Sequence, residues 1–78
     1  MYIIQITEKI IRGHVSGGID HLTNTPVVSI DSITQDGTTY TQGVDYKLTD
    51  NGVDWSLMGT EPAIDTAYTC TYTYNKSS

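Results

Sequence analysis

The chain has 78 residues, and its net charge of −5 comes from nine acidic against four basic residues. This length suits one domain and is too short for two. Because the bases are few and scattered, the chain would repel a phosphate backbone, and we expect no nucleic-acid partner. No stretch is long and apolar enough to cross a membrane, and the start lacks the basic region of a signal peptide, which predicts a cytosolic origin and no membrane partner.

Residues 2–12 fit two structures. Alternate residues from Tyr2 to Ile10 are apolar except Glu8, as on one face of a strand. The isoleucines also fit helical spacing, with Gly13 in the place of a C-terminal cap. Because β-branched residues favour strands, the pattern favours an N-terminal strand or arm, and a helix is the alternative.

Residues 13–26 are rich in Gly, Ser, Thr and Asn and predict a loop. Residues 13–18 carry the glycine spacing of a phosphate-binding loop, but Ile19 and Asp20 stand where Lys and Ser or Thr would hold the phosphate. The same loop contains the side chains of a hydrolase triad or a metal site, namely His14, Ser16, Asp20 and His21. Nothing in so short a loop enforces their geometry or supplies an oxyanion hole, so we predict neither catalysis nor metal binding.

Residues 27–75 are expected to form the β core. Val27 to Gln35 predicts a strand whose apolar residues change parity before Ile33, which indicates a bulge near Asp31 and Ser32. Asp36 and Gly37 then predict a two-residue turn that sets Ile33 opposite Tyr40.

A second hairpin is predicted around Asn51 and Gly52, a dipeptide preferred in type I′ turns because both positions need positive φ. With these two as the loop, Leu48 faces Trp55 across the pair. The apolar face then collects Tyr40, Val44, Tyr46, Leu48, Val53, Trp55 and Leu57. The polar face collects Lys47, Thr49, Asp54 and Ser56. Gly43 interrupts the incoming strand and predicts a kink.

Polar residues around this turn raise the question of a calcium site: Asp45, Asp50, Asn51 and Asp54. Aligning Gly52 with the invariant glycine of a calcium loop puts Lys47, Thr49 and Met58 at ligand positions, which excludes that loop. Turn chemistry explains the cluster, with an adventitious weak cation site as the alternative. We therefore predict no metal and no cofactor.

The remaining chain predicts a crossing loop and a last strand. Pro62 prevents ladder pairing within residues 58–65, and residues 67–75 alternate between tyrosines and threonines. Cys70 shares the tyrosine face and has no partner cysteine, so we expect a buried core thiol and no disulfide. Residues 76–78 are predicted to form a tail.

Trp55 is predicted to lie in the core. Its burial with Leu48 is worth several kcal/mol at about 25 cal/mol per Å², which a small domain can hardly forgo. The alternative is an exposed platform on which sugar rings stack. Short strands with close turns therefore predict one all-β domain over residues 1–78, a small immunoglobulin- or fibronectin-like β-sandwich of antiparallel hairpins.

Several segments carry a family resemblance: Pro26–Ile30, Thr39–Tyr46, Val53–Ser56, Gly59–Ala63 and Ala67–Tyr72, after Arg12-Gly13 and Gly17–Asp20. This pattern resembles a domain that recurs in tail-fibre and baseplate proteins of tailed bacteriophages and prophages, a family of unknown function. The chain departs from it at Cys70, where valine is expected, and at Ile64-Asp65, where a Pro-Gly turn is expected. These departures affect the shape of one loop.

The resemblance implies a non-catalytic structural module that spaces or docks neighbouring domains of a tail or baseplate protein. The expected partners are other tail or baseplate subunits, with a homo-oligomer in the parent protein. The expected location is the virion tail, after assembly in the bacterial cytoplasm. The family brings no catalytic, cofactor or metal residues. The alternative is a host-surface glycan-binding module that uses exposed aromatic residues, and burial of the aromatic residues distinguishes the two.

Overall fold

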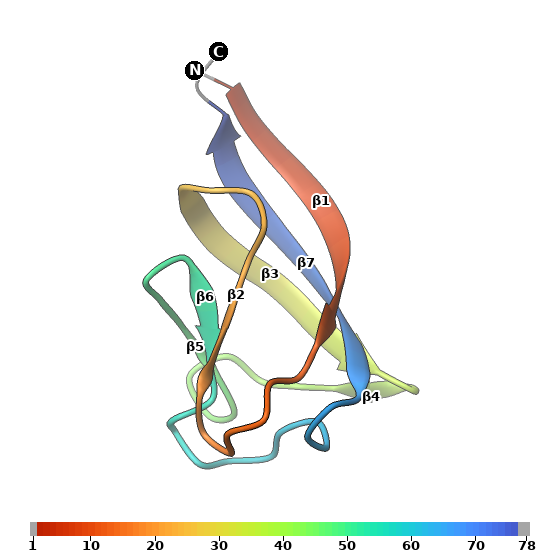
Figure 1. Cartoon of the computed structure of the whole chain (residues 1–78). Coiled ribbons are helices and arrows are strands. Elements are labelled where there is room, and N and C mark those ends of the chain that lie inside the picture. The colour runs from red at the N-terminus through yellow and green to blue at the C-terminus, as the bar shows by residue number, and fades with distance from the viewer. Residues whose placement is uncertain (1, 77–78) are drawn as a thin grey trace.

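The computed structural model describes residues 2–76, which form two antiparallel sheets packed as a sandwich. The larger sheet has the strand order β1 (Tyr2–Ile11), β7 (Ala67–Lys76), β3 (Val27–Gln35) and β4 (Thr38–Thr39). The smaller sheet has the order β2 (Ile19–His21), β6 (Gly52–Asp54) and β5 (Lys47–Thr49), and it lies against one face of the larger sheet (Figure 1). The predicted fold class, an all-β sandwich of antiparallel strands, is confirmed.

The N-terminal segment is a strand and not a helix. β1 pairs with β7 over its full length, from Tyr2 opposite Lys76 to Ile11 opposite Ala67. Its even positions face the other sheet and become more buried toward Ile10, while its odd positions are exposed. Lys76 belongs to β7 and so is not part of a tail; residues 77–78 of the predicted tail lie outside the described residues.

Residues 13–26, predicted as a loop, contain the three-residue strand β2. It pairs with β6, placing Ile19 opposite Asp54 and His21 opposite Gly52. A strand this short has no periodic pattern for sequence analysis to detect. The two strands approach closely at Gly52, where an added Cβ would lie 2.6 Å from Ile19 Cγ2 and 2.8 Å from the carbonyl oxygen of Asp20.

β3 and its turn agree with the prediction. The register between β3 and β7 shifts between Val27 and Ser29 and again between Ile30 and Ser32, so the predicted bulge is confirmed and a second one precedes it. The turn at 36–37 has positive φ at both residues, and β4 follows directly.

The second hairpin turn lies one residue earlier than predicted. Asp50 and Asn51 are its central residues, with φ of 49° and 61°, and Leu48 pairs with Val53 instead of Trp55. Moving a two-residue loop by one position changes each cross-strand partner by two residues. Because side chains alternate with a period of two, the predicted facing of the paired residues is unchanged.

The strand predicted to continue from Tyr40 to Leu48 is interrupted. The chain turns between β4 and β5, and Gly43, with φ of 85°, marks the predicted kink. Val44 lies in this turn and Leu57 follows β6, and both are exposed, so their predicted places on the apolar face are wrong.

The core lies between the two sheets around Trp55, which is 0% exposed. The rings of Tyr40, Tyr46 and Tyr68 meet it edge-on, with centroids 5.5 to 5.7 Å away. Such edge-to-face contacts add about 0.5–1.5 kcal/mol each beyond area burial. The predictions that Trp55 and Cys70 are core residues are confirmed.

The turn position gives a testable expectation. Asp50→Gly should change the free energy of unfolding by less than about 1 kcal/mol, because glycine adopts positive φ without strain. Gly52→Ala should destabilise by about 1–3 kcal/mol, because its Cβ would press against the backbone of β2. Urea unfolding followed by Trp55 fluorescence measures both variants. A greater cost for Asp50→Gly than for Gly52→Ala would show that the turn is not at 50–51.

Candidate functional site

A group of buried polar and aromatic side chains lies at one end of the sandwich. We call it the Arg12–Asp20 cluster, and it consists of Arg12, Asp20, Trp55, Glu61 and Tyr68. Arg12 follows β1, Asp20 is the middle residue of β2, Trp55 follows β6, and Tyr68 belongs to β7. Arg12 is 1% exposed and Asp20 7% exposed, which is rare for charged residues unless they are paired.

The Asp20 carboxylate accepts four hydrogen bonds. Arg12 Nη1 and the Gly13 amide donate to Oδ1, each at 3.0 Å. Trp55 Nε1 donates to Oδ2 at 3.2 Å, and the Tyr68 hydroxyl donates to the same oxygen at 2.7 Å. A carboxylate has about four lone-pair positions. All of them are used within the fold, so none is left for a metal ion or a substrate proton.

Arg12 connects this carboxylate to the loop and to the crossing segment. Its Nε donates to Glu61 Oε1 at 2.9 Å, and Nη2 forms an ion pair with the same oxygen at 2.8 Å. Nη2 donates its hydrogen bond to the carbonyl of Val15 at 2.7 Å. The other Glu61 oxygen accepts hydrogen bonds from the Ser16 hydroxyl and the Gly17 amide, both at 3.1 Å. The two charged pairs therefore hold the 13–17 loop in place by direct contacts.

Burial keeps the Tyr68 hydroxyl and the Cys70 thiol protonated. It raises the pKa of Tyr68 far above its ordinary value, and the hydrogen bond to Asp20 adds to this effect. Tyr68 is thus a permanent donor to that carboxylate. Burial also raises the pKa of the Cys70 thiol to about 12, with smaller contributions from Glu8 and Asp31. A thiol that stays protonated is a poor nucleophile.

The candidate triad residues are not brought together. His14 is exposed and its Nδ1 lies 2.7 Å from Asp65 Oδ1, while Ser16 binds Glu61. Asp20 is buried in the cluster and His21 is exposed. Within residues 2–76, no three His, Cys, Asp or Glu side chains are grouped as metal ligands would be.

The acidic residues near the second hairpin act separately in turns. Asp45 accepts hydrogen bonds from the amides of Thr41 and Thr60, at 2.8 and 2.9 Å, and these bonds lower its pKa. Hydrogen bonds from the Ser56 side chain and then from the Ser56 amide, the latter at 2.8 Å, lower the pKa of Asp54. Asp54 was expected on the polar face but is 4% exposed, because β2 covers its strand.

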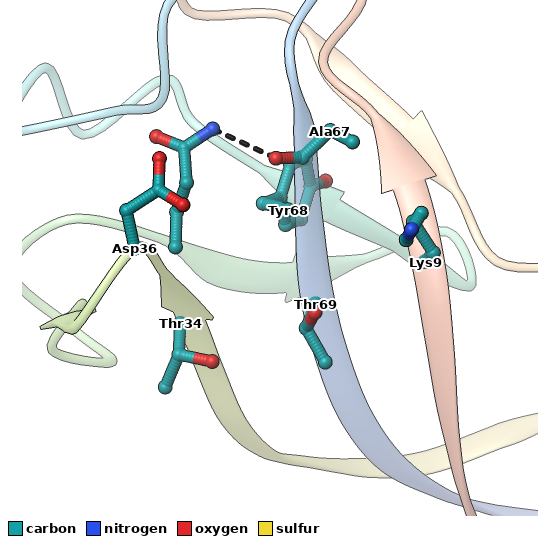
Figure 2. Close-up of a pocket in the computed structure, with 7 residues that line it drawn as sticks. Lys9, Thr34, Asp36, Ala67, Tyr68 and Thr69 are labelled. Atoms are coloured by element: carbon teal, nitrogen blue, oxygen red, sulfur yellow. Dashed lines mark hydrogen bonds between the residues drawn. The ribbon is translucent and has the colours of Figure 1, made fainter.

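A shallow groove of about 250 Å³ lies on the outer side of the larger sheet, beside the turn after β3 (Figure 2). Its lining is Lys9, Thr34, Gln35, Asp36, Ala67, Tyr68 and Thr69. Gln35 Nε2 donates to the carbonyl of Ala67 at 2.8 Å. Tyr68 is 2% exposed, so its ring is not presented to the groove as a stacking surface. Most of the residues that line the groove are polar or charged.

Asp20 was expected only as a triad or metal candidate, and no pattern in the sequence predicted the cluster. Its hydrogen-bond partners lie far along the chain, since Trp55 is 35 residues away and Tyr68 is 48 residues away. One feature of the sequence that could have indicated the cluster is its low content of charged residues, which is 17%. In such a chain, Arg12 directly after the apolar strand was a candidate for a buried ion pair.

Asp20→Asn tests the saturated carboxylate. The replacement is isosteric, but it removes the charge that pairs with Arg12 and turns an N–H group toward two donors. We expect a loss of about 3–5 kcal/mol of stability, against a total of about 5–15 kcal/mol for a domain. Thermal and urea unfolding measure this loss. The matched control is Asp65→Asn in the exposed pair with His14, which should cost less than about 1 kcal/mol. Equal costs for the two variants would contradict the assignment.

Cys70 provides an independent measure of core integrity. At pH 8 the native thiol should react with iodoacetamide at least about 100-fold more slowly than in the guanidinium-unfolded chain, because it is buried and its pKa is raised. Mass spectrometry of timed samples follows the reaction. Similar rates in the native and unfolded chains would show that Cys70 is accessible.

Comparison with known proteins identifies a family over nearly the whole chain. Residues 2–78 match the family described as "Domain of unknown function (DUF4815)". No curated protein and no solved structure matches the chain. Within residues 2–76, the structure contains no helix that is long and apolar enough to cross a membrane. With an all-β sandwich and a family match from Tyr2 onward, the chain belongs to the DUF4815 family.

Proposed function

We propose that the chain is a non-catalytic structural module of a phage or prophage tail or baseplate protein. The observation that carries this proposal is the saturation of the Arg12–Asp20 cluster. An acid–base residue needs a free proton site within reach of a reactant. The Asp20 carboxylate instead binds four donors of the same chain, and Arg12 is spread over three acceptors. These hydrogen bonds stabilise one conformation of the fold.

The arrangement of the strands favours a module that docks onto a neighbouring domain over one that separates two domains along a line. Tyr2 at the start of β1 lies opposite Lys76 at the end of β7, so the described chain enters and leaves at the same end of the sandwich. A module attached through both of these points projects sideways from the path of its parent protein. Its longest dimension is 36 Å, which sets how far it extends. Such a projection suits contact with a neighbouring domain or subunit.

The assignment to tails and baseplates rests on the sequence segments that resemble domains of those proteins. It includes the virion tail as the location, assembly in the bacterial cytoplasm, and other tail or baseplate subunits as partners. The family match adds an independent reason to treat these segments as one unit, because it covers residues 2–78.

A glycan-binding module is the alternative, and the burial of the aromatic residues counts against it. The rings of Tyr40, Tyr46, Trp55, Tyr68 and Tyr72 are all in the core. Tyr2 is 60% exposed and lies at the end of β1, where the groove of Figure 2 does not reach. Tyr74 is half-buried and packs against the core beside Tyr72, so sugar stacking would have to rely mainly on the terminal ring of Tyr2.

The proposal is tested by locating the protein in particles. Tails purified from a phage-producing culture that encodes the chain should contain its peptides in a constant ratio to other tail proteins. An antibody against the folded domain should label the tail in electron micrographs. Detection of the protein only outside particles would contradict the proposal.

The glycan alternative is tested with the isolated domain. Incubation with host cells and their surface polysaccharide should give no binding, and Tyr2→Ala should behave as the parent chain. Saturable binding that Tyr2→Ala abolishes would instead support the glycan-binding module.

A further inference from the structure

One of the four sheet edges differs from the others. β4 has two residues, and β2 and β5 have three each, whereas β1 has ten. Proteins commonly protect sheet edges by keeping the edge strands short. β1 is therefore the edge with enough unpaired backbone to bind another strand, and it forms one side of the sandwich in Figure 1.

β1 has few of the features that prevent an edge strand from pairing. It contains no proline, and its register with β7 runs without a bulge from Tyr2 to Ile11. Its only acid, Glu8, is turned away from the exposed face and binds the Tyr72 and Thr23 hydroxyls, each at 2.5 Å. Lys9 is the only charge on the exposed face of this strand. In the part of the chain that the structure describes, no backbone hydrogen bond is formed along the outer side of β1.

We propose that two copies of this chain pair through β1, antiparallel and edge to edge, with a two-fold axis at Thr7. The two four-stranded sheets would then continue as one sheet across the interface. This contact is isologous and closes on itself, so it produces a dimer and not a fibre. It stands whether or not the chain belongs to a phage tail.

The position of the axis follows from the side chains of β1. An axis at Thr7 sets Ile3 against Ile11 and Gln5 against Lys9 on the exposed face, with no like charges opposed. Ile3 and Ile11 are 60% and 58% exposed, so pairing covers apolar surface that the single chain leaves in water.

Neighbouring registers give less favourable side-chain pairs across the interface. An axis at Glu8 would oppose two carboxylates directly. An axis at Ile6 would set Ile3 against Lys9, so that Ile3 and Ile11 would no longer face each other. All three registers keep inner residues opposite inner residues, so charge and apolar pairing decide among them.

Net charge does not prevent this contact. The chain carries −5, but β1 holds a single acid, and that acid is engaged away from the exposed face. The interface is one strand wide, which places it at the low end of interface sizes. We therefore expect a weak dimer, with a dissociation constant of about 10 µM to 1 mM. Attachment to a larger assembly would raise the effective concentration and favour pairing.

Sedimentation velocity of the 78-residue chain from about 5 µM to 2 mM tests this inference. We expect a reversible change from monomer to dimer. Thr7→Lys should weaken dimerisation at least about tenfold, because it opposes two cations at the axis. The matched control is Thr71→Lys on β7. The two threonine hydroxyls bind each other at 2.9 Å, so both variants remove the same hydrogen bond and add the same charge to the same face, but only Thr7 lies on the edge.

A charge-swap experiment fixes the register. Thr7→Glu alone should also be monomeric, and mixing it with Thr7→Lys should restore a dimer of one copy of each. Trp55 emission shows that each variant is folded, because that ring is in the core. A chain that stays monomeric throughout, species larger than a dimer, equal weakening by Thr7→Lys and Thr71→Lys, or no recovery in the mixture would each overturn the proposal.

Discussion

The structure depends most on the burial of the Asp20 carboxylate. Removing a carboxylate from water costs several kcal/mol unless donors replace the lost hydration. Here the donors come from three separate segments of the chain, which contain Arg12 and Gly13, Trp55, and Tyr68. Displacement of any one segment leaves a buried charge with a missing partner. This requirement explains how strands of three residues can hold the smaller sheet in a fixed position.

Trp55 links this polar cluster to the apolar core. Its ring is packed edge-on by three tyrosines, and its N–H group binds Asp20. A domain of this size buries only about 60% of the surface of its unfolded chain, so its stability margin is thin. Trp55 contributes both a large buried apolar surface and a charge-assisted hydrogen bond, which suits a small core. Tyr68 and Tyr72 likewise bury their rings and hydrogen-bond through their hydroxyls.

The sequence predicted the parts of the fold that depend on local pattern. β1, β3 and β7 have nine or ten residues each, long enough for alternation to be visible. β2 is too short for this, and its position is set by contact with β6. The turn was displaced by one residue because Asp and Asn also tolerate positive φ, and the close approach of β2 occupies the space beside Gly52. The Arg12–Asp20 cluster depends on contacts between distant segments, which alternation does not encode.

The polar groups that stabilise this protein differ from those that are available to a partner, because the former already form hydrogen bonds within the fold. Its buried charged side chains Arg12, Asp20 and Asp54 all bind within the fold, and the threonines of β7 bind across the outer face to β1 and β3. These polar side chains therefore stabilise the fold. The described chain still has unpaired backbone groups along the outer side of β1, which has ten residues. Backbone pairing recognises an extended strand and requires no reactive side chain. A protein built in this way is suited to assembly, because its interior resists rearrangement while one edge remains available for pairing.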